Sequence, residues 1–277
     1  MNRSCRLTGV ALALVFAQAA AMAAIAPDVA QDLMKKSGLW GQFDSLGAQV
    51  RGGMADAVPH GGDPHAEATK TRMLACADTA YSADAMRATA VGAVSGALQA
   101  TDVSTLTAWY DSALGRQVAG MEEASTAQVI DPQERLRRGS AALETASATR
   151  KASLQAILAE TRSVDIMADT VIESAIAVRQ GVAGANGTAT AVAMSDVRAD
   201  LSARRPELVA RYSQMALPAY AFAYAGLDDD ELKRYADYLA GASAKTYNDG
   251  SVRGVARALS DGSVKLGRCL KDAAAKP

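Results

Sequence analysis

The chain has few of the residues that build common reaction centres. Its 277 residues include only two histidines and three cysteines, and aromatic residues make up 5% of the sequence. Basic residues are not in excess, because 29 Lys and Arg face 30 Asp and Glu for a net charge of −1. A general nucleic-acid binder needs a clustered surplus of Lys and Arg, so this balance argues against that class. After residue 23, no apolar stretch approaches the ~20 residues that span a bilayer.

Sequence motifs for nucleophilic catalysis and nucleotide binding are also lacking. The segment 92–96 reads Gly-Ala-Val-Ser-Gly, which is not a Gly-x-Ser-x-Gly elbow because its first glycine lies one place too far from the serine. Neither Gly-x-x-x-x-Gly-Lys nor Gly-x-Gly-x-x-Gly occurs. Both histidines lie in one short segment, so a Ser-His-Asp triad would have to take its base from there. We therefore predict no catalytic residue, no cofactor-binding residue and no cofactor.

The two histidines form the one candidate metal site. His60, Asp63 and His65 lie in Pro-His-Gly-Gly-Asp-Pro-His, and imidazole and carboxylate groups ligate zinc or copper. The intervening Gly-Gly and Pro break any helix that would align these ligands, so the spacing fits no strong signature. A solvated loop is the favoured interpretation, and a metal site at these three residues is the alternative.

The first 23 residues have the pattern of a secretory signal. Arg3 and Arg6 precede a short apolar region, and Ala-Met-Ala at 21–23 is a small-x-small cleavage site before Ala24. An uncleaved N-terminal anchor is the alternative. We expect an exported, periplasmic or secreted protein, of bacterial type, that is not an integral membrane protein after cleavage.

Cleavage would leave two cysteines, Cys76 and Cys269, in an oxidising compartment. Two cysteines there most simply form a disulfide, which would tie the C-terminal tail to the first half of the chain. Two separately buried thiols are the alternative.

Alanine makes up about a fifth of the chain, and it favours helices because it loses no side-chain entropy on ordering. Two runs have apolar residues at helical spacing: Leu106, Trp109, Tyr110, Ala113 and Val118, and then Leu232, Tyr235 and Leu239. Further helices are predicted to start at Asp131, which precedes Pro132 and Glu134, and at Asp228, which precedes Glu231. Glycines between 181 and 187 predict a loop.

The two apolar runs match at a constant offset of 126 residues: Leu106, Trp109, Asp111 and Gly115 correspond to Leu232, Tyr235, Asp237 and Gly241. This match predicts an internal duplication. The expected fold is an all-α helical bundle of two related halves, residues 24–140 and 141–277, after a signal peptide at 1–23.

Two segments carry a resemblance to a known family. Residues 103–116 read Val-Ser-Thr-Leu-Thr-Ala-Trp-Tyr-Asp-Ser-Ala-Leu-Gly-Arg, and residues 33–39 read Leu-Met-Lys-Lys-Ser-Gly-Leu. They resemble the exported bacterial family catalogued as domain of unknown function twenty fifty-nine, with Trp109 in place of its aromatic and Arg116 in place of its lysine. The resemblance implies an all-helical exported fold and brings no known activity or catalytic residues.

Aromatic residues gather in the second half: Tyr212, Tyr220, Phe222, Tyr224, Tyr235, Tyr238 and Tyr247. Residues 217–225 are predicted to form a helix buried on both sides, with a strand as the rival interpretation. The tyrosines are expected mainly in the core, and the alternative is that they line a ligand cleft between helices. Arg135, Arg137 and Arg138 are expected on a solvated helix face, with contact to anionic envelope polymers or lipid as the alternative.

These observations favour a non-catalytic helical protein of the cell envelope. It would bind an envelope protein or a small apolar ligand through a helical groove. The runner-up is a metal-dependent hydrolase or metal-handling protein that uses the loop from His60 to His65, and a third class is a structural spacer.

Overall fold

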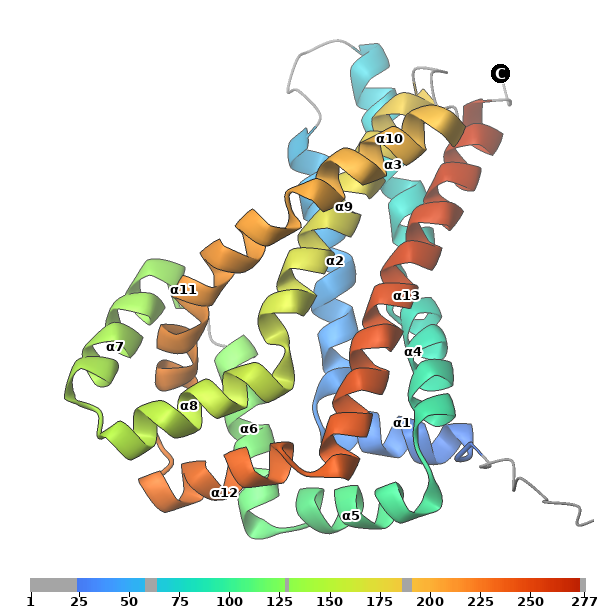
Figure 1. The fold of residues 1–277 in the computed structure, drawn as a ribbon. Helices are drawn as coiled ribbons and strands as arrows, with labels where there is room; N and C mark the ends of the chain where they lie inside the picture. Colours follow the sequence, from blue (N-terminus) through green and yellow to red (C-terminus); the bar gives the residue numbers. More distant parts are fainter. Residues whose placement is uncertain (1–23, 58–63, 128–129, 186–190, 275–277) are drawn as a thin grey trace, which may run out of the picture.

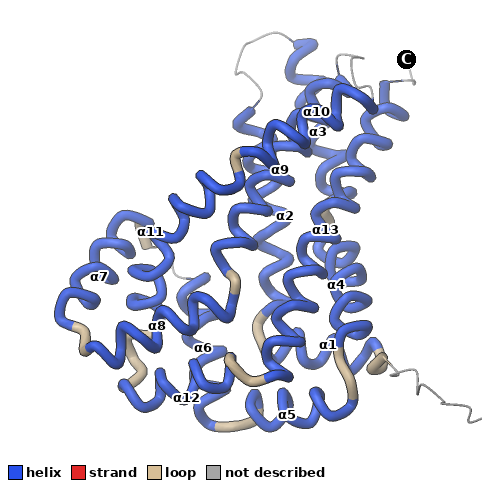
Figure 2. Tube along the Cα trace, in the orientation of Figure 1, coloured by secondary structure: helices blue, strands red, loops and turns tan. Residues whose placement is uncertain are grey.

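The computed structural model describes residues 24–57, 64–127, 130–185 and 191–274, and every regular element within them is an α-helix (Figure 2). The helices are α1 (Pro27–Lys36), α2 (Leu39–Ala57), α3 (Pro64–Ala80), α4 (Ala83–Ala97), α5 (Ala100–Tyr110), α6 (Ala113–Ala127), α7 (Pro132–Thr145), α8 (Ala148–Thr161), α9 (Ser163–Ala185), α10 (Ala191–Ala203), α11 (Arg205–Ala223), α12 (Asp229–Leu239) and α13 (Ala242–Ala274). The predicted all-α class is confirmed. The strand interpretation of residues 217–225 is wrong, because α11 continues through them to Ala223.

The long C-terminal helix α13 organises the larger of the two main hydrophobic cores, and a small third cluster of Ile172, Ile176 and Leu201 lies between α9 and α10. It runs beside α4, α3 and α9, with α2 behind α9 (Figure 1). Small residues allow the close approach of α13 to α4, since a Cβ at Gly254 would lie 3.0 Å from Ala90 Cα. Around this contact the core buries large side chains from α1 to α4, among them Phe43, Met54 and Met86. No helix in the described ranges has the length and apolar character needed to cross a bilayer.

A disulfide joins the two ends of this core. Cys76 of α3 and Cys269 of α13 are bonded with a Cα–Cα distance of 5.7 Å, as the sequence predicted. Nearby, the Tyr81 hydroxyl and Ser263 Oγ, also from opposite ends of the chain, form a buried hydrogen bond of 2.9 Å. The C-terminal end of α3 is therefore fixed to α13.

The second core lies at the other side of the molecule, among α6, α8, α11 and α12 (Figure 1). Leu154, Ile157 and Leu232 are its most buried aliphatic residues. The larger core draws on residues 25–106 together with 247–270, so it combines parts of both predicted halves. The two segments that match in sequence, 106–115 and 232–241, each begin within a short helix, α5 and α12 respectively. The duplication of whole halves is not confirmed and stays a prediction.

The apolar run from Leu106 to Val118 forms two helices, and the prediction of one continuous helix is wrong. α5 ends at Tyr110, and Ser112 Oγ accepts a hydrogen bond of 2.9 Å from the backbone N–H of Gly115, which caps the start of α6. A Cβ at Gly115 would lie 2.0 Å from the carbonyl oxygen of Trp109, so this tight turn requires glycine.

The other local predictions had mixed outcomes. Asp228 and Glu231 form the predicted capping box, with bonds of 2.7 and 3.0 Å between each side chain and the other's backbone N–H. Asp131 caps α7 through the N–H of Gln133 at 3.1 Å, whereas Glu134 binds arginines of its own helix instead of closing a box. The loop predicted at 181–187 is wrong as far as residue 185, because α9 includes these glycines at a cost of only ~1 kcal/mol each.

Candidate functional site

A cleft of about 770 Å³ lies between the two cores. Its walls come from the start of α2, the end of α5, α6, the end of α11, α12, the first turns of α13 and the break between α8 and α9. These segments are far apart in the sequence and meet because the larger core and the second core face each other there. A cleft of this size matches sites that hold a drug-sized molecule.

Seven aromatic rings follow one another along the cleft, and we call them the aromatic run: Tyr220, Tyr224, Tyr235, Trp109, Tyr238, Tyr110 and Tyr247. Trp109 is stacked on Tyr238 with ring centroids 4.1 Å apart and planes at 8°, and Tyr235 is nearly parallel to it at 5.8 Å. The remaining neighbours meet edge to face at 5.6–6.3 Å, a favourable geometry for aromatic pairs. These tyrosines therefore pack against one another as core residues, as expected, and they also line the cleft.

A carboxylate lies against the middle of the aromatic run. Glu122 of α6 accepts hydrogen bonds on Oε1 from the hydroxyls of Tyr224, at 2.6 Å, and Tyr235, at 2.7 Å. Burial raises the pKa of Glu122, and these two bonds oppose the rise because they stabilise the ionised form. Burial, together with the charge of Glu122, raises the pKa of both phenols well above the ordinary value.

Hydroxyl groups lie at both ends of the aromatic run. The Tyr247 hydroxyl and Ser37 Oγ are 2.5 Å apart, and the Tyr220 hydroxyl and Thr161 Oγ1 are 2.8 Å apart. In both tyrosines burial raises the pKa, and the bond to the neighbouring hydroxyl opposes this in part. Both phenols therefore stay protonated at neutral pH and are available as donors or acceptors.

Three further hydroxyls in the cleft wall lack a hydrogen-bond partner among the described residues: Ser163 Oγ, Tyr238 OH and Ser251 Oγ. Each oxygen is buried and interacts with one neighbouring tyrosine hydroxyl, that of Tyr220, Tyr110 and Tyr247 respectively, without the geometry of a full hydrogen bond. A buried polar group without a partner costs about 1–3 kcal/mol. Their concentration in one cleft is therefore an unusual feature of this wall.

Arg150 fixes the end of α11 beside the start of α12. Its guanidinium donates to the carbonyl oxygens of Tyr224 and Leu227, both at 2.8 Å, and to Asp229 at 3.2 Å. Ser147 Oγ donates to the same carboxylate at 2.6 Å, and these contacts lower the pKa of Asp229. Arg150 thus holds the backbone of Tyr224, one of the two tyrosines that bind Glu122, and connects it to the start of α12.

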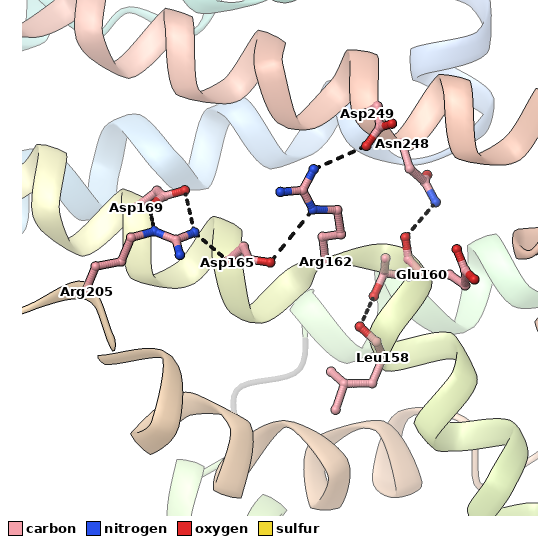
Figure 3. Close-up of polar contacts among 9 residues, drawn as sticks. Leu158, Glu160, Arg162, Asp165, Asp169, Arg205, Asn248 and Asp249 are labelled. Atoms are coloured by element: carbon pink, nitrogen blue, oxygen red, sulfur yellow. Dashed lines mark hydrogen bonds and ion pairs between the residues drawn. The ribbon is translucent and has the colours of Figure 1, made fainter. Parts of the chain in front are cut away.

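The break between α8 and α9 is fixed by ion pairs (Figure 3). Arg162 takes a left-handed backbone conformation, φ 51°, and its side chain pairs with Asp249 of α13 at 3.2 Å and Asp165 at 3.7 Å. Arg205 of α11 binds Asp165 and Asp169, at 2.6 and 2.7 Å. The break turns Thr161 and Ser163 toward the cleft, where both line the wall.

The residues proposed from the sequence have different outcomes. His60 and Asp63 lie outside the described residues, and the side chain of His65, in the first turn of α3, is also outside the description. No group of three potential metal ligands occurs in the part of the chain that is described. Arg137 and Arg138 lie on an exposed face, paired with Glu134, as expected. Arg135 differs, because it lines the cleft with its Nε buried.

The central residue of the cleft, Glu122, was missed by sequence reasoning. No motif surrounds it, and its two tyrosine partners are 102 and 113 residues away. Only the clustering of tyrosines in the second half indicated a cleft. Charged residues in helical proteins are mostly solvated, so no local pattern distinguishes Glu122 from the other acidic residues.

Comparison with known proteins adds no relative. No family model matches the chain, and no curated protein and no solved structure gives a match. The resemblance carried by residues 33–39 and 103–116 therefore remains a prediction.

Proposed function

We propose that this protein is an exported helical binding protein that takes a small molecule into the cleft between its two cores. The observation that carries the proposal is the convergence, in one cleft, of the aromatic run, the Glu122 carboxylate and three buried hydroxyls without a partner among the described residues. Ligand sites are typically apolar and aromatic, with a few placed polar groups. A bound molecule would supply the missing partners to these hydroxyls.

Two observations support export. The disulfide between Cys76 and Cys269 is typical of an oxidising compartment. The backbone of Ile25, two residues after the expected cleavage site, is bound to Ser95 of α4 by an N–H to carbonyl bond of 3.2 Å and by the serine hydroxyl. Cleavage after Ala23 would therefore leave this first contact intact.

Native mass spectrometry of protein purified from the periplasm of a bacterial host tests the proposal. We expect a non-covalent adduct of drug-like mass that is lost in Ala119→Phe, because this substitution places a ring in the cleft wall. The matched control is Ala124→Phe on the same helix, at an exposed position outside the wall, which should retain the adduct. Equal adducts in both variants would refute binding in the cleft. Periplasmic protein without any adduct, together with no thermal stabilisation by a metabolite library, would refute ligand binding altogether.

A further inference from the structure

The cleft has one electrostatic centre, the carboxylate of Glu122. Its negative charge raises the pKa of four phenols in the aromatic run: Tyr220, Tyr224, Tyr235 and Tyr238. These residues come from α11 and α12, so the field of Glu122 reaches across the whole second-core side of the cleft. Phenol oxygens and ring faces also carry negative partial charge. The middle of the cleft is therefore a favourable place for a positive charge.

The other charged groups in the wall do not change this sign. Five charged side chains line the cleft: Lys35, Asp44, Glu122, Glu123 and Arg135. Lys35, Asp44 and Glu123 are exposed at the surface, where solvent screens their charge. Asp44 is further bound to Arg87 at 2.5 Å. Arg135 of α7 is the one cation of the wall that is not exposed, and it already has an interaction partner of its own.

Aromatic rings of this cleft already hold cations of the chain itself. At the α2 side of the cleft, Lys35 Nζ lies 5.4 Å from the ring centroid of Trp40, and the Arg87 guanidinium lies 4.9 Å from it. Both distances are within the range of a cation–π contact. The same chemistry is available deeper in the cleft, where aromatic rings and the carboxylate lie together.

We propose that the ligand of the cleft is an organic cation, a protonated amine on an apolar or aromatic body, with its ammonium group against Glu122. This inference rests on the proposed function and specifies the chemistry of the ligand. The ammonium N–H groups would bond to the carboxylate and to neighbouring hydroxyls, and the body would lie along the aromatic run. The buried hydroxyls Ser163, Tyr238 and Ser251 can accept from such N–H donors or from polar groups of the body.

Intrinsic fluorescence gives a direct assay, because the only two tryptophans of the chain, Trp40 and Trp109, both line the cleft. The probes are 2-phenylethylamine, its neutral analogue 2-phenylethanol and the anion 3-phenylpropanoate, titrated at pH 7. We expect the amine to bind about tenfold more tightly than the alcohol, and the anion to bind most weakly, as a charge-assisted bond plus a cation–π contact implies.

The variants locate the preference. Glu122→Gln keeps the shape and an acceptor for both phenols, and it should bind amine and alcohol equally. Glu144→Gln, at an exposed position of α7 outside the cleft wall, should keep the tenfold preference. Loss of the preference in Glu144→Gln, or its survival in a folded Glu122→Gln, would overturn the assignment to Glu122.

A second measurement does not depend on the folding of Glu122→Gln. In the Glu123→Gln protein the carboxylates lining the cleft are Glu122 and the Arg87-bound Asp44. The surrounding phenols have raised pKa values and stay protonated below pH 8. The preference for the amine should disappear as the pH falls through the raised pKa of Glu122. A preference that is constant from pH 7 to pH 3.5 would overturn the proposal.

The outcomes separate the two levels of inference. Binding of the alcohol or the anion at least as tightly as the amine refutes the cationic ligand and leaves the cleft as a small-molecule site. No response to any of the three probes refutes both.

Discussion

Removing the disulfide between Cys76 and Cys269 should lower the stability of this protein strongly. The bond connects residues that are 193 apart in sequence, and loop-closure entropy grows with the logarithm of that number. The chain-entropy model gives a stabilisation of about 5 kcal/mol at 25 °C for a loop of this length. Native domains are stable by only about 5–15 kcal/mol in total, so this bond is a large share.

Urea unfolding of the oxidised and the reduced protein measures this contribution. With a slope of about 3 kcal/mol per M for a chain of this size, 5 kcal/mol corresponds to a midpoint lower by roughly 1.5–2 M after reduction. Helical circular dichroism follows the whole fold, while fluorescence follows Trp40 beside the larger core and Trp109 beside the second core. Mass spectrometry after alkylation confirms the redox state of each sample.

Cys76→Ala with Cys269→Ala is the matched variant. It should unfold near the reduced wild type, with a small further loss because Cys76 is buried in the larger core. Identical midpoints for the oxidised and reduced proteins would refute the reasoning. So would the same alkylation with and without prior reduction, since the pair would then not be bonded.

Three further predictions follow from single contacts. Gly139→Ala should destabilise the fold by about 1–3 kcal/mol in urea unfolding, because the new Cβ would lie 1.9 Å from the carbonyl oxygen of Pro218. Gly92→Ala, which has open space around it, should instead stabilise α4 by about 0.5–1 kcal/mol. A change of the same sign in both variants would contradict the structure. Arg150→Met should lower the free energy of unfolding by roughly 2–3 kcal/mol by leaving two backbone carbonyls without their donor, and an unchanged midpoint would show that these bonds do not stabilise the end of α11. Glu122→Gln should gain stability relative to the wild type as the pH rises from 4 to 8. Burial raises the pKa of Glu122, so ionisation of this carboxyl in the wild type costs folding stability above that pKa. Parallel profiles of stability against pH for the two proteins would count against a buried carboxylate.

Local signals in the sequence were sufficient for the helices but not for every boundary. The capping box at Asp228 and Glu231 was predicted correctly because both partners lie within one turn. The break at Asp111 and Ser112 was missed, although a serine three residues before Gly115 is a local capping signal. Apolar spacing continued across it because the first helix buries Leu106 in the larger core and the second buries Val118 in the other core. A periodic pattern does not show that its residues serve two different cores.

The sequence by itself determined that this protein is helical and favoured a bond between Cys76 and Cys269, since helix capping, alanine content and cysteine number are properties of short segments or of composition. Only the tertiary structure decided the cleft. Glu122, Tyr224 and Tyr235 meet across more than a hundred residues, and their meeting depends on how the two cores place α6, α11 and α12. Such long-range contacts leave no spacing in a single sequence, because they depend on the packing of whole helices and not on neighbouring residues.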